Sequence, residues 1–310
     1  MPLANLLLLG ASGFFGPHLV RAARRRDWRV HAASRRPAQA PRTSGVVPGG
    51  IIPDELHAFD ALAPDGLSAL VDAVRPSAIV LAAALARVDE CEREPARAAA
   101  LNTELPAALA HLARARSLRL VHLSTDLVFG SRPARAARYD EDDPPSPVHA
   151  YGRTKAAGEA RVLETDPHAL VLRLPLLYGD SFGRGLGASD QVLAALARGE
   201  RPTLFHDEWR TPLEAGNAAE AVLELLAGDA HGLLHLAGPA RLNRHELALA
   251  VLEAHGLGAR ASSLRSAPRS ALGQEELRPG DVSLDARRAS RQLSCALLAP
   301  AEALRAAALP

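Results

Sequence analysis

Residues 3–16 read LANLLLLGASGFFG, and this stretch predicts the order strand, glycine turn, helix. The apolar run over 3–9 is typical of a strand that is buried on both faces of a parallel sheet. Gly10, Gly13 and Gly16 follow at GxxGxxG spacing, which allows a tight turn and lets a pyrophosphate approach the backbone. An amphipathic helix over 17–28 and a second strand over 29–34 complete a βαβ unit, which is typical of dinucleotide-binding folds.

The rest of the chain continues this alternation of strands and helices. A helical pattern covers 95–115, and residues 37–53 are rich in Pro and Gly and predict a loop. Further strands are expected over 78–83, 119–124, 169–174 and 233–236. The predicted fold class is therefore α/β, a doubly wound parallel sheet of the Rossmann type with a smaller C-terminal substrate-binding cap.

The domain layout follows from the same pattern. Residues 1–176 and 206–239 are expected to form the dinucleotide-binding Rossmann domain. Residues 177–205 and 240–310 are expected to form the smaller substrate-binding domain. A chain of 310 residues fits one large α/β unit with an appendage.

Composition excludes several classes of protein. The net charge is only +1, because 36 basic residues face 35 acidic ones, and nucleic-acid binding is therefore not indicated. Cys91 and Cys295 lie far apart and form neither a disulfide framework nor a metal-like spacing, so no metal site is predicted. No segment is long enough to span a membrane, and the cytoplasm is the expected compartment.

The end of the second predicted strand indicates the cofactor. An acidic residue at this position holds the ribose of NAD, whereas arginine accommodates the 2′-phosphate of NADP. The sequence here is Ser34-Arg35-Arg36, without a carboxylate, which favours NADP(H) with NAD as the second option. The competing interpretation is a solvated surface turn.

Tyr151 and Lys155 form the second chemical signal, in the stretch YGRTKAAGE over 151–159. Four residues apart on a helix, they lie on one face, and an ammonium beside a phenol lowers the phenol's pKa. Lys155 is the only lysine in a chain that otherwise uses arginine. An i, i+4 pair is a common coincidence, but the upstream glycine turn and a strand that ends in Ser124-Thr125 favour a catalytic pair.

With these motifs the chain resembles the extended short-chain dehydrogenases/reductases, whose active site is a Ser or Thr followed by Tyr-x-x-x-Lys. Within them it is most similar to the dTDP-4-dehydrorhamnose reductase family, which includes the methionine adenosyltransferase β subunit. The specific signals are VDECEREP, STD followed by VF, EWRTP over 208–212, and RPGDVSLDARRA near the C-terminus. Leu127, where the reductases usually carry an aromatic residue, and the GFFG turn are departures from the family pattern.

The resemblance implies a role for each site residue. Thr125, Tyr151 and Lys155 would be catalytic: Thr125 would bond the substrate carbonyl, Tyr151 would donate the proton, and Lys155 would lower the pKa of Tyr151 and bind the nicotinamide ribose. Thr125, Asp126 and Arg210 would contact the substrate, and an ion pair of Arg210 with Asp207 or Glu208 is the competing structural interpretation. The cofactor would bind Gly10, Ser12, Gly13, Phe14, Phe15, Gly16, Ser34, Arg35, Arg36, Asp60, Ala61, Ala82, Ala83, Ala84, Asn102, Tyr151, Lys155 and Pro175.

The leading functional interpretation is an NADPH-dependent reductase of a nucleotide-linked 4-keto sugar. A sugar-nucleotide epimerase is the alternative enzyme, whereas a dehydratase is disfavoured because Leu127 stands where that chemistry needs an acidic residue after Asp126. A non-catalytic regulatory protein that binds NADP is the alternative from another class. The expected partner is a nucleotide sugar, without nucleic acid or membrane, and the interpretation leaves room for a homodimer.

Overall fold

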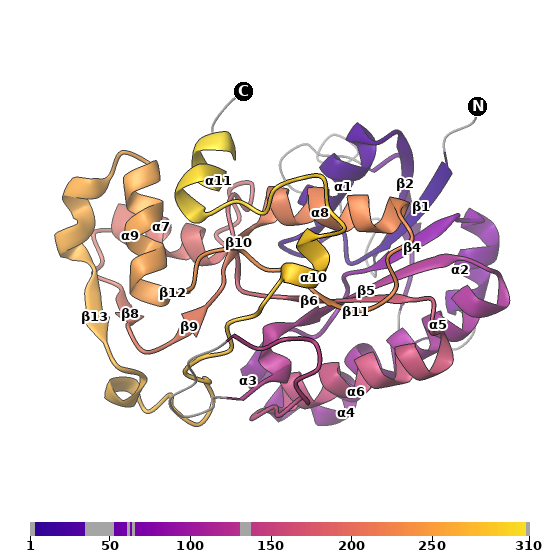
Figure 1. The fold of residues 1–310 in the computed structure, drawn as a ribbon, viewed down its shortest axis with the longest axis horizontal. Helices are drawn as coiled ribbons and strands as arrows, with labels where there is room; N and C mark the ends of the chain where they lie inside the picture. Colours follow the sequence, from indigo (N-terminus) through magenta and orange to yellow (C-terminus); the bar gives the residue numbers. More distant parts are fainter. Residues whose placement is uncertain (1–3, 35–52, 61–62, 64–65, 131–137, 308–310) are drawn as a thin grey trace. The chain divides into compact units, whose positions relative to one another are not determined.

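The computed structural model describes residues 4–34, 53–60, 63, 66–130 and 138–307. It contains a seven-stranded sheet in the order β11-β6-β5-β4-β1-β2-β3 (Figure 1). The strands are β1 (Ala4–Leu9), β2 (Trp28–Ser34), β3 (Glu55–Ala58), β4 (Ala78–Leu81), β5 (Arg119–Thr125), β6 (Leu170–Leu174) and β11 (Gly232–His235). The pairings from β3 to β5 are parallel. The predicted α/β fold with a parallel sheet is confirmed.

Alternate residues of the strands cover the two faces of this sheet, as the pleat requires. Leu7 and Leu9 of β1, with Ile79 and Leu81 of β4, belong to a core that also contains side chains from α2 (Gly66–Val74), α5 (Leu105–Ala115) and α6 (Ala150–Thr165). The intervening Leu6, Leu8 and Val80 are fully buried on the other face. There α1 (Gly16–Arg25) lies on the side of the sheet opposite α5 and α6 (Figure 1).

Contacts divide the chain into two compact units. The first comprises Met1–Ser124, His149–Leu172 and Val222–Leu234, and the second comprises Thr125–Val148, Arg173–Ala221 and His235–Pro310. The assignment of nucleotide binding and substrate binding to the two expected domains stays a prediction. No helix within the described ranges is long and apolar enough to cross a membrane.

The second unit is built from short elements around α9 (Arg244–Ala254). Leu247 and Val251 of α9 pack with Tyr178 and with Leu304 of α11 (Pro300–Ala307). On another side, Ala248 and Leu252 pack with α7 (Ala188–Ala197). Its short strands are β7 (Leu177–Tyr178), β8 (Thr203–Phe205), β9 (Trp209–Arg210), β10 (Leu213–Glu214), β12 (Leu242–Asn243) and β13 (Arg265–Ala267). The remaining helices in the described ranges are α3 (Val88–Arg93), α4 (Pro95–Ala99), α8 (Ala215–Ala227) and α10 (Arg287–Ser290), with short 3-10 segments at Asp126–Val128, Gly258–Ser263 and Arg269–Leu272.

Sequence periodicity missed one strand of the seven-stranded sheet, the six short strands of the second unit and one helical irregularity. The edge strand β3 was not predicted, because four half-buried residues give too short a pattern. The helix expected over 95–115 forms, but Ala100–Glu104 adopt a π-helical turn between α4 and α5. Such single turns are frequent at functional sites, and this one contains the buried Asn102.

The glycine turn is shaped by two close backbone contacts. Gly10 has φ +102°, and a Cβ there would lie 2.5 Å from the backbone N of Ala83 at the end of β4. A Cβ on Gly16, the first residue of α1, would lie 2.1 Å from the carbonyl O of Ala11. Neither contact can be relieved by a rotamer change, since the obstructing atoms belong to the backbone.

We expect Gly16→Ala to lower the free energy of unfolding by at least about 2 kcal/mol, because the methyl group forces the turn and α1 apart. Gly13→Ala is the matched control, since its Cβ would meet only the Gly10 O, at 3.3 Å, and should cost under about 1 kcal/mol. Urea denaturation of the three proteins measures the difference. Equal midpoints for Gly16→Ala and Gly13→Ala would show that the turn is not held as closely as described.

Candidate active site

The glycine turn opens onto a pocket of about 630 Å³ in the first unit. Its wall combines the turn with the ends of neighbouring parallel strands, which is where doubly wound sheets bind ligands. The lining residues are Leu9, Gly10, Ser12, Gly13, Ala33, Phe59, Asp60, Ala82, Ala83, Ala84, Leu85, Ala86, Arg87, Glu90, Arg97 and Leu101. We call this the glycine-turn pocket.

Several predicted cofactor residues line this pocket. They are Gly10, Ser12, Gly13, Asp60, Ala82, Ala83 and Ala84. The helix that follows the turn begins without a side-chain cap at Phe15 and without an acidic residue in its first turn, so its own first turn places no negative charge at its N-terminus. Phe14 and Phe15 belong to the same turn, and Ser34 ends β2. The predicted Arg35, Arg36 and Ala61 lie outside the described residues.

Asn102 binds the segment after β4 that lines the glycine-turn pocket. Its Oδ1 accepts from Leu85 N at 2.9 Å, and its Nδ2 donates to Leu85 O at 3.0 Å and to Thr154 Oγ1 at 3.1 Å. The side chain is fully buried, and both amide hydrogens are used by protein groups. Asn102 therefore ties the segment after β4 to α6, and its predicted contact with a cofactor stays a prediction.

Lys155 on α6 is held by two groups of β5. Its Nζ donates to Leu123 O at 2.7 Å and lies 3.3 Å from His122 Nε2. The side chain is 1% exposed, and this burial lowers the pKa of Lys155 to about 8. Burial, reinforced by the Lys155 charge, holds the pKa of His122 well below its usual value, so His122 is neutral and its Nε2 can accept from the ammonium.

A second link joins the same helix to the same strand. The Ser124 hydroxyl donates a hydrogen bond to the Glu159 carboxylate, one turn beyond Lys155 on α6. Glu159 is also the charge that favours the protonated form of Lys155 against burial. Strand β5 thus places both Lys155 and its nearest counter-charge. His122 was not predicted, since nothing local in RLVHLS distinguishes it from a core residue.

Tyr151 lies in the first turn of α6. The helix begins after His149, whose Nδ1 accepts from Gly152 N at 3.0 Å and so caps the first turn. The half-buried Tyr151 packs against a small core of Leu85, Cys91, Ala98 and Ala150. Because the helix is regular from Ala150 to Thr165, Tyr151 and Lys155 lie on one face, as predicted.

Thr125 is the last residue of β5 and the first of the second unit. Its Oγ1 accepts from Leu127 N at 3.2 Å and donates to Asp126 Oδ1 at 3.3 Å, which caps the short helix Asp126–Val128. It directly follows Ser124, so β5 contains both the residue that bonds Glu159 and Thr125, the predicted hydroxyl residue of the active site.

Arg210 and Asp126 belong to a buried charge cluster in the second unit. Arg210 Nε lies 3.4 Å from Asp126 Oδ2, and its NH2 lies 3.4 Å from Glu208 Oε1. Its NH1 donates to the carbonyls of Trp209 and Pro279. These contacts favour the structural interpretation with Glu208, whereas Asp207 instead bonds Arg269. A substrate contact of Arg210 stays a prediction.

The same cluster borders a second pocket, of about 230 Å³, in the second unit. Arg278 NH1 lies 3.1 Å and Arg244 Nε 3.7 Å from the Glu208 carboxylate, and both arginines line this pocket with Phe205. Among the described residues that form these ion pairs, three arginines face two carboxylates, Glu208 and Asp126, which leaves one positive charge in excess there. Burial raises the pKa of Asp126 to about 6, which weakens its compensation further as pH falls.

Arg244 and Arg278 were not among the predicted site residues. Arg278 begins the motif RPGDVSLDARRA and Glu208 begins EWRTP, but no local pattern showed that these two residues meet or that Arg244 joins them. Pro175 follows β6 and belongs to the second unit. Its contact with a cofactor, like that of Phe14, Phe15 and Ser34, stays a prediction.

Comparison with known proteins agrees with this geometry. The chain is 32% identical over 245 residues to the probable low-salt glycan biosynthesis reductase Agl14 of Haloferax volcanii, covering 77% of this chain and 79% of that protein. It is 31% identical to the dTDP-4-keto-6-deoxy-D-glucose reductase of Streptomyces niveus, covering 88% and 85%. The crystal structure of dTDP-4-dehydrorhamnose reductase from Bacillus anthracis in complex with NADP has a TM-score of 0.83 over 98% of both chains at 19% identity, which shows a shared fold.

A family match covers nearly the whole chain. Residues 4–308 match the family described as RmlD substrate binding domain. The match includes the glycine turn, Tyr151 and Lys155 in the first unit, and Arg210 and the second pocket in the second. The predicted resemblance is confirmed, and the chain belongs to the RmlD substrate-binding domain family of extended short-chain dehydrogenases/reductases.

Proposed function

We propose that the protein is an NADPH-dependent reductase of a nucleotide-linked 4-keto sugar. As a member of its family it is an NAD(P)-dependent oxidoreductase, and the names of its relatives Agl14 and the Streptomyces niveus enzyme support a reductase. The observation that carries the proposal is Lys155, buried and bonded to β5 one turn after Tyr151, in the unit that contains the glycine-turn pocket.

The glycine-turn pocket suits a dinucleotide. The backbone approach at Gly10 leaves no room for a side chain, and small residues at Ala82, Ala83 and Ala84 leave the end of β4 open. Apolar Ala33 and Phe59 line one wall, as expected beside an adenine ring. Arg35 and Arg36, which follow Ser34 in the sequence, favour the 2′-phosphate of NADP. NADPH, when bound, supplies the hydride.

The residues of α6 would then manage the proton. Negative charge builds on the substrate oxygen as the carbonyl is reduced, and a positioned acid must neutralise it. Tyr151 holds the proton at its hydroxyl, and transfer to the substrate oxygen leaves a phenolate. The Lys155 ammonium stabilises that phenolate, and its bonds to Leu123 O and His122 keep its own position fixed. Thr125 would orient the carbonyl.

The second pocket suits the nucleotide end of the substrate. Arg244 and Arg278 present guanidinium groups beside an apolar wall that contains Phe205, Pro202 and Leu204. A diphosphate needs the cations, and a pyrimidine base suits the apolar wall. The excess positive charge of the cluster supports an anionic ligand.

The proposal is tested by turnover. The purified protein should oxidise NADPH, followed by absorbance, when a dTDP-4-keto-6-deoxy sugar is added, and NADH should be the poorer donor. Tyr151→Phe removes the proton and should lower kcat by ~100-fold or more, with NADPH binding retained. NADPH binding without turnover of any 4-keto sugar nucleotide would favour a regulatory protein, and interconversion of sugar epimers without net oxidation would favour an epimerase.

A pH-dependent stability test examines the burial of Lys155. Its pKa of about 8 in the fold lies below its ordinary 10.5, so between these values the unfolded chain binds more protons and stability rises with pH. This group should contribute a gain of about 1.4 kcal/mol per pH unit at most in that interval, and none below pH 8. The free energy of unfolding of the unmodified protein, minus that of Lys155→Met, should therefore rise by roughly 2 kcal/mol from pH 7.5 to pH 10 in urea titrations. A constant difference would mean that the ammonium remains hydrated.

Arg278 tests the second pocket. Arg278→Gln should raise KM for the nucleotide sugar by ~10-fold or more with little change in kcat, because it removes a charge-assisted contact to the diphosphate. Arg241→Gln is the matched control: Arg241 belongs to the same unit and is similarly exposed, but it pairs with Asp281 and does not line the pocket. If both variants keep the original KM, the nucleotide binds elsewhere.

A further inference from the structure

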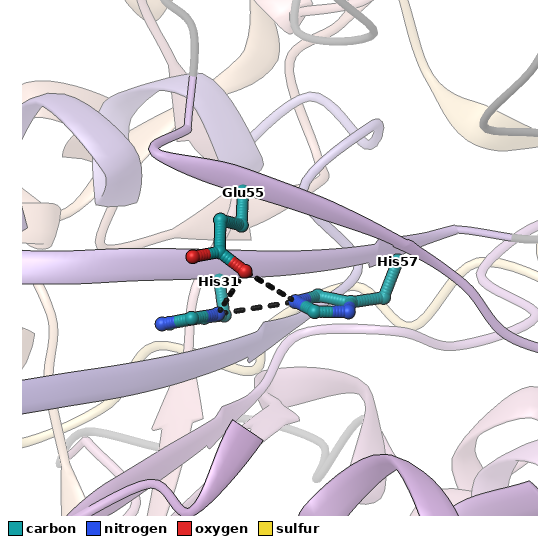
Figure 2. Close-up of side chains that lie close together, drawn as sticks. All are labelled: His31, Glu55 and His57. Carbon is teal, nitrogen blue, oxygen red and sulfur yellow. Dashed lines mark hydrogen bonds and ion pairs between the residues drawn. The ribbon is translucent and has the colours of Figure 1, made fainter. Parts of the chain in front are cut away.

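A cluster of two histidines and one glutamate lies at the edge of the sheet, outside the proposed active site (Figure 2). His31 comes from β2, and Glu55 and His57 come from the neighbouring β3. The register pairs His31 with Glu55 and Ala33 with His57, so alternation places all three side chains on the same face of the sheet. Figure 2 shows the two imidazoles and the carboxylate directed toward one another.

The three facing atoms are spaced as the corners of one coordination site. His31 Nδ1 lies 3.1 Å from His57 Nε2 and 3.5 Å from Glu55 Oε2, and the latter two atoms are 3.8 Å apart. A point about 2.0 Å from all three atoms exists for a triangle with these sides, and this equals the Zn–N and Zn–O bond lengths.

The surroundings prepare the ligand atoms for a cation. His31 is 4% exposed, and its Nδ1 faces both His57 Nε2 and Glu55 Oε2. Arg29 bonds Glu55 Oε1, which orients the carboxylate and leaves Oε2 toward the histidines. Such outer contacts to a ligating carboxylate are typical of metal sites.

A bond between two neutral histidines is the simpler explanation of the 3.1 Å contact. It leaves the glutamate unexplained, since Glu55 Oε2 faces both rings although it could remain in solvent with Arg29. Nothing in the pair alone requires the three atoms to converge.

We propose that His31, Glu55 and His57 bind a divalent transition-metal ion, for which Zn²⁺ is the best match, with water completing the coordination. Imidazole and carboxylate ligands suit Zn²⁺, whereas Mg²⁺ and Ca²⁺ prefer oxygen ligands alone. Glu55 and His57 are partly exposed, which leaves the water-bearing side open to solvent. The ion would join β3 to β2. His31 lies two residues before Ala33 and His57 two residues before Phe59, and both Ala33 and Phe59 line the glycine-turn pocket. The expectation from sequence alone was that no metal site exists.

Zinc titration of the tag-free, chelator-treated full chain tests the site. Calorimetry at pH 7.5 should show one Zn²⁺ bound per chain, and Co²⁺ should give the strong visible absorption of a four-coordinate site. His57→Gln and Glu55→Gln, which alter partly exposed side chains, should each weaken Zn²⁺ binding at least tenfold. His168→Gln is the matched control, because the His168 and His231 rings lie near each other but belong to no group of metal-ligand spacing among the described residues, and it should bind as the unmodified protein does.

Melting temperature gives a second measurement that does not depend on enzymatic activity. Zn²⁺ should raise it in the unmodified protein and in His168→Gln, and should not raise it in His57→Gln or Glu55→Gln, whose folding is checked without metal by circular dichroism. Absence of saturable binding at one ion per chain overturns the proposal. Zn²⁺ binding that survives both His57→Gln and Glu55→Gln, or that is lost in His168→Gln, places the site elsewhere and overturns it too.

Discussion

The close approach of backbone to backbone at the glycine turn is the constraint on which the first unit depends. Gly10 meets the chain at Ala82 and Ala83, and Gly16 meets Ala11, in both cases without space for one methyl group. This contact brings the end of β1, the glycine turn and the residues that follow β4 around one pocket. Small residues are required at all of these places for the same reason. A larger side chain would fill the pocket or separate the elements that form it.

Two kinds of buried cation distinguish the two units. In the first unit, burial dominates over the favourable charge of Glu159 and lowers the pKa of Lys155 to about 8. In the second unit, Arg210 and Arg244 face Glu208, with Asp126 beside Arg210, so opposite charges offset much of the cost of burial. A lysine near its pKa can assist proton transfer, whereas a guanidinium stays charged and suits permanent recognition of an anion. The use of one lysine and many arginines in this chain fits that division.

The edge strand β3 has features that discourage unwanted pairing with another chain. An edge strand exposes unpaired backbone groups, and short length and charged side chains discourage pairing with another chain. β3 has only four residues, and Arg29 and Glu55 place an ion pair across β2 and β3. The same short strand carries Phe59 and Asp60 into the glycine-turn pocket directly after its last residue. Its register with β2 therefore influences both the edge and the pocket.

Local patterns were enough to predict much of this protein. Apolar runs and the glycine spacing predicted β1, β2, β4, β5, β6 and β11 and the parallel α/β fold, because a buried strand and a turn are encoded by neighbouring residues. The i, i+4 spacing of Tyr151 and Lys155 predicted that they share a helix face, since one helix determines that geometry.

Contacts between distant segments could not be read in the same way. His122 lies next to Lys155 because α6 packs against β5. Arg244 and Arg278 face Glu208 because the folding of the second unit brings these distant positions together. The meeting of His31 with Glu55 and His57 depends on strand register, in which a shift of one residue would turn the side chains of β3 to the opposite face. Periodicity shows which face of an element is buried, but it contains no information on which distant residue that face will meet.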